Sequence, residues 1–221
     1  MRKLSALIIS KKEVDRCPKA LCLKCLLLIV FVVVLACGCK DKRQRAIELN
    51  EEGWKLMGTW MPDSQEMALA FFDKAIDMDS TYSVAYVNKV QCLNSLNRRA
   101  EIMSTMEKAY RNADSKKHKM QALFSIGTYY GTLGDSVKAD SCLRKVLDME
   151  PEVLKELGGD LYEGMDFIFV RHLLGMDKEA QECFDRVERE YKEKHDTMGW
   201  NFYRRILKVD RRTLLRGQQQ E

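Results

Sequence analysis

Apolar and small residues recur at helical spacing through the middle of this chain, and residues 122–151 show the pattern most clearly. Ala139, Leu143 and Val146 fall at i, i+4 and i+7, which places them on one face of a helix. A preceding helix is predicted to contain Gly127, where the missing side chain allows a second helix to pass close by. The pattern therefore predicts two packed antiparallel helices.

A turn and a terminator bound the second of these helices. Gly134 supplies a residue that tolerates a left-handed conformation, and Asp135 follows as a helix N-cap. Pro151 cannot continue a helix, and we expect it to mark where the next unit begins. Together with the spaced apolar face, these residues resemble one complete tetratricopeptide repeat (TPR).

The same pattern recurs on both sides, over roughly residues 44–191. Equivalent small, turn and second-helix positions are Gly53, Ala68, Phe72 and Ala75, then Ala85, Val90, Leu96, Asn97 and Ala109, and finally Gly175, Ala180, Phe184 and Val187. A single such unit cannot bury its apolar face alone, so neighbouring units must stack. The resemblance implies an all-α fold, a right-handed superhelical stack of about four TPR-like helix pairs. We expect residues 197–216 to add an amphipathic C-terminal capping helix, or alternatively to fold back into the groove.

The N-terminus predicts export. Residues 1–24 are basic, and an apolar run of eleven residues, 26–36, follows. This run is too short to span a bilayer and has the build of a cleaved secretory signal. Residues 34–37 (VLAC) resemble a bacterial lipobox, which implies lipidation of Cys37, with Cys39 as the alternative. An ordinary signal and an uncleaved anchor remain open.

Removal of residues 1–36 changes the charge of the chain. The full sequence carries 37 Lys and Arg against 33 Asp and Glu, a net charge of +4. The first 36 residues hold seven basic and two acidic side chains, so 30 basic and 31 acidic ones remain, a net charge of −1. Nucleic-acid binding therefore loses its electrostatic support. A basic stretch persists at residues 204–216, either as a solvated helix face or as a docking surface for an acidic partner or anionic headgroups.

Chemistry-bearing residues are sparse in the predicted mature chain. His118, His172 and His195 lie in three separate segments, and no nucleophile elbow, Walker loop or dinucleotide fingerprint occurs. Cys142 and Cys183 occupy equivalent repeat positions, too far apart for a disulfide, and we expect free thiols. We therefore expect no enzyme, no catalytic residue, no metal site and no cofactor except a covalent lipid.

In the TPR fold the first helix of each pair lines a concave surface that holds a peptide or a helix of a protein partner. The resemblance places ten residues on that surface: Trp54, Met57, Val87, Asn88, Gln91, Phe124, Ser125, Thr128, Met165 and Phe169. A competing interpretation is that the apolar members pack against the chain's own last helix.

These observations divide the chain into a lipoprotein signal peptide (1–36), a lipid-anchored tether (37–45), a TPR-like array (46–196) and a capping helix with a frayed tail (197–221). The predicted function is a non-catalytic interaction scaffold of a Gram-negative envelope. The resemblance to lipoproteins implies enteric-type sorting, in which aspartate after the lipidated cysteine favours the inner membrane. Because Gly38 follows Cys37, we expect the outer membrane, and the periplasmic side over the cell surface. The alternatives are an accessory lipoprotein for ligand capture in an uptake system, and a structural partner for wall or membrane through the basic C-terminal helix.

Overall fold

The computed structural model describes residues 42–59, 61–162, 164–191 and 197–216. Residues 46–221 form a compact unit separate from residues 1–45. The predicted signal peptide and both candidate lipidation sites, Cys37 and Cys39, lie outside the described residues. Within those residues, no helix combines the length and the apolar character needed to cross a membrane.

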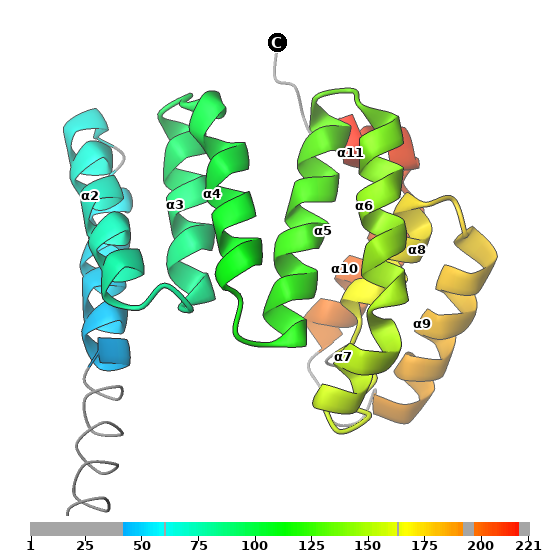
Figure 1. The fold of residues 1–221 in the computed structure, drawn as a ribbon. Helices are drawn as coiled ribbons and strands as arrows, with labels where there is room; N and C mark the ends of the chain where they lie inside the picture. Colours follow the sequence, from blue (N-terminus) through cyan, green and yellow to red (C-terminus); the bar gives the residue numbers. More distant parts are fainter. Residues whose placement is uncertain (1–41, 60, 163, 192–196, 217–221) are drawn as a thin grey trace, which may run out of the picture. The chain divides into compact units, whose positions relative to one another are not determined.

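All regular secondary structure in the described residues is helical (Figure 1). Residues 42–57 are helical, and the elements that follow are α2 (Pro62–Met78), α3 (Ser83–Ser95), α4 (Arg99–Asn112), α5 (Lys116–Thr132), α6 (Ser136–Asp148), α7 (Glu150–Glu156), α8 (Asp166–Leu173), α9 (Asp177–Tyr191), α10 (Thr197–Ile206) and α11 (Arg211–Arg216). Each of α2 to α6 contacts the next helix, and α6 continues the contacts to α8, which packs on α9. The predicted all-α stack of helix pairs is confirmed.

The turns inside the pairs have the backbone that the sequence predicted. Asn97, Gly134 and Gly175 adopt positive φ angles of 57°, 80° and 74° at equivalent positions. Glycine adopts this conformation without steric cost, and asparagine is the side chain that tolerates it best. The Asp135 carboxylate accepts a hydrogen bond from the backbone N–H of Lys138 and so caps the N-terminus of α6. Three of the pairs are therefore closed by the same local geometry.

The small positions allow the close packing expected of them. A Cβ atom built on Gly53 would lie 2.6 Å from the Phe72 ring, and one on Gly127 would lie 3.0 Å from the Cβ of Cys142. The predicted second-helix faces are buried: Ala68, Phe72, Ala75, Ala139, Leu143, Val146, Ala180, Phe184 and Val187. Sequence periodicity therefore identified the buried second-helix residues of the first, third and fourth pairs, whereas Ala109 of the second pair is only partly buried.

The segment after α6 differs from the prediction. Pro151 does not mark the start of the next pair, because it lies in the first turn of the short helix α7. Proline is well accommodated there, since the first turn of a helix needs no backbone donor. Gly158 and Gly159, both with positive φ, follow α7, and the fourth pair begins only at Asp166.

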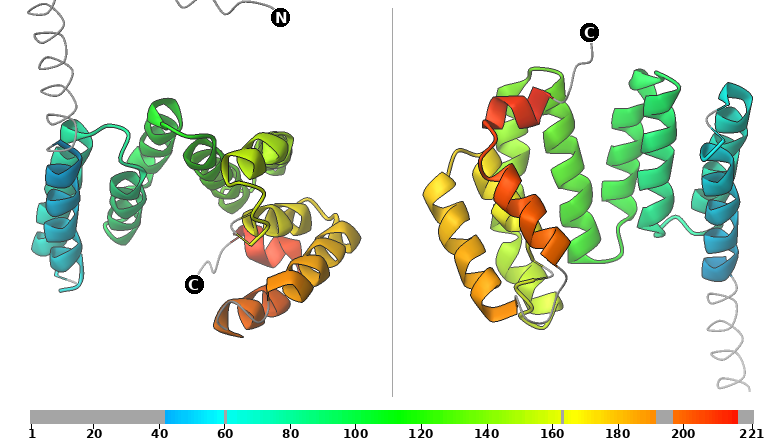
Figure 2. Two further views of the ribbon diagram at one scale, coloured as in Figure 1. Left: turned by 90° about the horizontal axis from the view of Figure 1, so that it is seen from below. Right: turned by 180° about the vertical axis from the view of Figure 1, so that it is seen from behind.

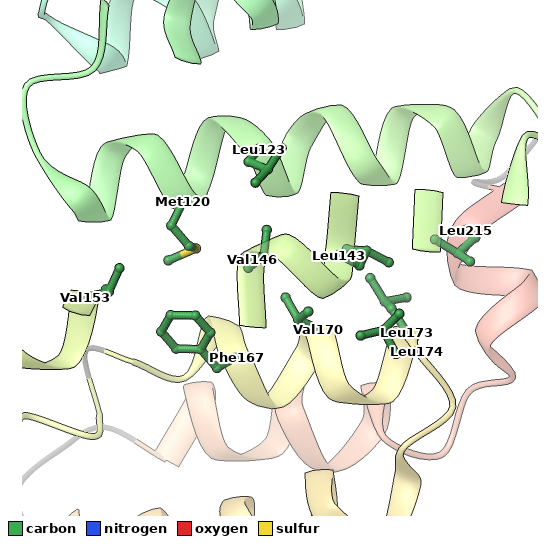
Figure 3. Close-up of a cluster of buried hydrophobic side chains, with 10 residues drawn as sticks. All are labelled: Met120, Leu123, Leu143, Val146, Val153, Phe167, Val170, Leu173, Leu174 and Leu215. Carbon is green, nitrogen blue, oxygen red and sulfur yellow. The ribbon is translucent and has the colours of Figure 1, made fainter. Parts of the chain in front are cut away.

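One apolar cluster joins the third pair to the elements that follow it. Met120 and Leu123 from α5 meet Leu143 and Val146 from α6, and α7, α8 and α11 contribute the remaining side chains (Figure 3). Val153, Phe167, Val170, Leu173, Leu174 and Leu215 complete this cluster. Because α11 contributes Leu215, the end of the chain is part of the core.

The C-terminal segment contains two short helices in place of the single helix expected over residues 197–216. The helix is interrupted at residues 207–210, where the Asp210 carboxylate accepts a hydrogen bond from the backbone N–H of Arg212. Helix α10 packs on the fourth pair through Trp200, which is buried among side chains of α8 and α9. Helix α11 contacts α5 and α8 instead (Figure 2). The segment thus covers the last pair and also reaches back to the third.

Candidate binding groove

A groove of about 270 Å³ opens between α3 and α5, the first helices of the second and third pairs. Helix α4 contributes Met106 and Ala109 to its lining. The other lining residues are Ser83, Val84, Tyr86, Val87, Val90 and Gln91 from α3 and His118, Gln121, Ala122 and Ser125 from α5. The groove therefore lies where the repeat pattern predicts the concave surface.

Exposed valines form the α3 wall. Val84 and Val87 lie one helical turn apart, and 45% and 54% of their respective surfaces remain exposed. Solvated apolar side chains that line a concavity gain free energy when an apolar partner covers them. This wall is the part of the groove best suited to binding.

The polar groups of the groove are hydroxyls, amides and one imidazole, that of His118. The Ser125 hydroxyl donates to the backbone oxygen of Gln121 at 2.9 Å. His118 Nδ1 lies 2.8 Å from a carboxylate oxygen of Asp114, outside the groove lining. Among the described residues, no Asp, Glu, Lys or Arg lines the groove. Its surface therefore offers apolar contact together with amide and hydroxyl hydrogen bonds.

The next groove along the stack, between α5 and α8, is closed. The rings of Phe124 and Phe169 meet edge to face, with centroids 5.7 Å apart. Near the C-terminal end of α5, a Cβ atom on Gly131 would lie 2.8 Å from a methyl group of Leu215, because α11 packs there. The chain's own side chains therefore occupy the space between the third and fourth pairs.

Three of the ten predicted groove residues, Val87, Gln91 and Ser125, line the open groove. Trp54 is exposed on the helix of residues 42–57, and Met57 packs on the apolar cluster around Phe72. The Thr128 hydroxyl donates to the backbone oxygen of Ser125. Phe124 and Phe169 are partly buried against each other, as described above.

Two predicted groove residues are buried between helices. Asn88 is buried, and its amide nitrogen donates to the side-chain oxygen of Asn50 at 2.9 Å. Met165 is buried with Trp200 and Phe184 because α10 covers it. Both side chains serve contacts between helices, so the prediction that they are accessible to a partner is wrong.

Sequence reasoning missed most of the groove lining. Val84 lies three residues before Val87, and Gln121 lies four residues before Ser125, so each shares a helix face with a predicted residue. Helical spacing was therefore a signal that could have found them. His118 was set aside as an isolated histidine, although it lies one turn before Gln121 on the same face.

Charged contacts attach the C-terminal segment to the stack. Arg211 pairs with Asp140 of α6 at 2.9 Å, and Arg204 pairs with Glu188 of α9. His172 is buried on α8, with Nδ1 2.7 Å from a carboxylate oxygen of Asp177 and Nε2 2.9 Å from the backbone oxygen of Val209. Burial also raises the pKa of the Tyr203 hydroxyl well above its usual range. These contacts hold α10 and α11 in place.

The thiols of the described residues are structural. Cys92, Cys142 and Cys183 are free, as predicted, and Cys92 donates to the backbone oxygen of Gln65. Burial raises the pKa values of the Cys92 and Cys142 thiols, which lowers their thiolate content and their reactivity. Within the described part of the chain, no group of three or more His, Cys, Asp or Glu residues is arranged to hold a metal ion.

Comparison with known proteins agrees with this architecture. Residues 121–153 match the tetratricopeptide repeat family. The matched residues lie in α5, in α6 and at the start of α7, within the stack of helix pairs.

A solved structure described as YrrB, a TPR protein with an unusual peptide-binding site, is similar over 80% of this chain and 85% of its own. The two sequences are 19% identical, and the TM-score is 0.39. No curated protein matches the chain.

Proposed function

We propose that this protein is a non-catalytic scaffold that binds a peptide or helix of a protein partner in the groove between α3 and α5. The observation that carries the proposal is the exposed valine wall of Val84 and Val87 over a groove of about 270 Å³. Stacked helix pairs use such grooves for extended or helical ligands, whose side chains fill apolar pockets while amides fix their orientation. Gln91 and Gln121 supply amides on opposite walls.

The proposed location is the bacterial envelope. Cys37, with Cys39 as the alternative, would carry a lipid after cleavage of residues 1–36, and residues 37–45 would tether the repeats to the outer membrane on its periplasmic side. The build of the N-terminal sequence supports this proposal. Mass spectrometry of the membrane-associated protein tests it, because a diacylated N-terminal cysteine has a diagnostic mass. An unmodified mature N-terminus would refute the lipid anchor while leaving the groove proposal intact.

Site-specific photo-crosslinking from Val87 in the native host tests the groove. Val87 is preferred to Phe124, since Phe124 already contacts Phe169. Val137 on α6 is the matched control, a valine that is 80% exposed and remote from the groove lining. We expect a discrete protein adduct from Val87 and none from Val137.

Two results would contradict the proposal. The same protein adducts in equal yield from both positions would mean that the groove does not bind a partner specifically. Adducts only within the chain would mean that the groove serves the protein's own folding.

A further inference from the structure

Some basic residues of the C-terminal segment, formed by α10 and α11, pair with acidic residues of the stack, and others do not. Arg204 and Arg211 pair with Glu188 and Asp140, acidic residues of the stack. These two pairs attach the segment to α9 and α6, so they are part of the fold.

Among the other cations of the segment, three have side chains that the structure describes: Arg205, Lys208 and Arg212. All three are exposed, and none forms an ion pair within the part of the chain that the structure describes. Asp210, the acidic residue among them, accepts a hydrogen bond from the backbone N–H of Arg212. Three positive charges therefore face solvent without a compensating partner from the stack.

The same segment carries an exposed aromatic ring. Phe202 is 49% exposed on α10, one turn before Arg205, whereas Trp200 and Tyr203 point into the fourth pair. Both helices lie at the surface of the stack, with α10 over the fourth pair and α11 against α5 (Figure 2). The exposed residues of the segment thus combine cations with an apolar ring, while Trp200, Tyr203 and Leu215 pack against the stack.

We propose that Phe202, Arg205, Lys208 and Arg212 form a docking surface for an anionic lipid membrane. Uncompensated cations are attracted to anionic headgroups, and an aromatic ring is favoured at the boundary between headgroups and acyl chains. A purely acidic protein would satisfy the charges but would leave Phe202 in water. The surface is separate from the α3–α5 groove, so the proposal does not depend on the proposed function.

Binding to vesicles tests the proposal with protein that begins at residue 42. This protein retains the compact unit of residues 46–221 and lacks the apolar run at 26–36, which would itself enter a bilayer. Co-sedimentation is measured with vesicles of phosphatidylglycerol and phosphatidylcholine, and with vesicles of phosphatidylcholine alone. We expect binding to the anionic vesicles only, and weaker binding as salt is raised.

The decisive variant combines Arg205→Gln, Lys208→Gln and Arg212→Gln. Each cation near an anionic surface strengthens binding about fivefold, so the triple variant should bind roughly 100-fold more weakly. The matched control, Arg144→Gln with Lys145→Gln and Lys178→Gln, removes the same charge from exposed positions on α6 and α9 and should bind with little change. Circular dichroism checks that both variants are folded.

Contact between Lys208 and the vesicle surface can also be measured in the full-length chain. Acetylation of Lys208, followed by mass spectrometry, should be slower on anionic than on neutral vesicles, while acetylation of Lys178 should be equal on both. Absence of binding to the anionic vesicles, equal losses in both triple variants, or equal labelling of Lys208 on both vesicles would overturn the proposal. Binding to immobilised polyglutamate without binding to the vesicles would also overturn it, in favour of an acidic protein.

Discussion

Asp135 shows how much of a repeat depends on one side chain. Its carboxylate accepts the backbone N–H of Lys138 at 3.0 Å and lies 2.9 Å from the ammonium of the same residue. The hydrogen bond from the ammonium, followed by the one from the backbone, holds the pKa of Asp135 below its usual range. The Asp135 carboxylate therefore caps the N-terminus of α6 directly after the turn at Gly134, and it also pairs with the Lys138 ammonium.

We expect Asp135→Ala to destabilise the fold near neutral pH, with a deficit that shrinks in acid. Because the pKa of Asp135 is lower in the folded than in the unfolded chain, its carboxylate stabilises the fold above the ordinary aspartate pKa, about 4. That contribution is lost as the pH falls below this value. Urea unfolding at pH 7 and at pH 3 measures the difference.

Asp135→Asn is the control for this experiment, since an amide oxygen still caps the helix without a charge. It should retain most of the stability and lose the pH dependence. A deficit in Asp135→Ala that is equal at both pH values would show that the charge of Asp135 makes no contribution.

At the scale of the element, α10 depends on Trp200. The indole is buried among Phe184, Tyr162 and the side chains of α8, and the two rings lie 6.0 Å and 5.6 Å from it between centroids. Its N–H is buried without a hydrogen-bond partner among the described residues. Trp200 therefore contributes apolar area and ring contacts, and its polar atom opposes burial.

Trp200→Ala is expected to lower the free energy of unfolding by about 3–5 kcal/mol, or by the full docking energy of α10 if that is smaller. Trp200→Phe should cost less than about 1.5 kcal/mol, because the ring is kept and the unsatisfied N–H is removed. Urea unfolding of the two variants measures the comparison. A Phe variant as unstable as the Ala variant would show that the indole N–H has a partner in solution.

Elements set by local signals were predictable, and those set by distant contacts were not. The turns at Gly134 and Gly175 and the second-helix faces that contain alanine are determined within a few residues of sequence. Their spacing was therefore enough to predict them. The space between α5 and α8 is closed because Phe124 meets Phe169, 45 positions later, and because α11 packs against Gly131. These contacts between distant residues leave no local pattern in the sequence.

Other departures from the prediction have physical reasons of their own. Pro151 is compatible both with the end of a unit and with the first turn of a helix, so its residue type alone could not decide between them. Asp210 inside the expected C-terminal helix was a cap signal that could have divided that helix in two. The burial of Asn88 depends on the position of Asn50, and the burial of Met165 depends on the position of α10. No local sequence pattern gives either position.

At the scale of the whole molecule, stability is distributed along the stack. Most helix contacts are with sequence neighbours, and the C-terminal segment adds contacts from α11 to α5 and α8. Stacks of this kind gain stability from nearest-neighbour interfaces. A change that weakens one interface is therefore expected to destabilise mainly the helix pairs next to it.

Deletion of residues 197–221 should therefore loosen the fourth pair selectively. The truncation removes the cover over Met165, Ile168 and Phe184. Amide hydrogen exchange should rise several-fold in α8 and α9 and change little in α2 to α4. A uniform rise through α2 to α9 would show that the stack opens as a single cooperative unit.

The amide bridge between Asn50 and Asn88 has a consequence beyond its own energy. A buried amide that loses its partner is penalised, so sliding or exchanging the first helix against α3 would leave two unsatisfied side chains. Apolar faces built from alanine and leucine are nearly interchangeable from one repeat to the next, and they discriminate weakly among neighbours. The contact therefore favours the native register of the first helix on α3, and it disfavours both a shifted register and the helix of another molecule.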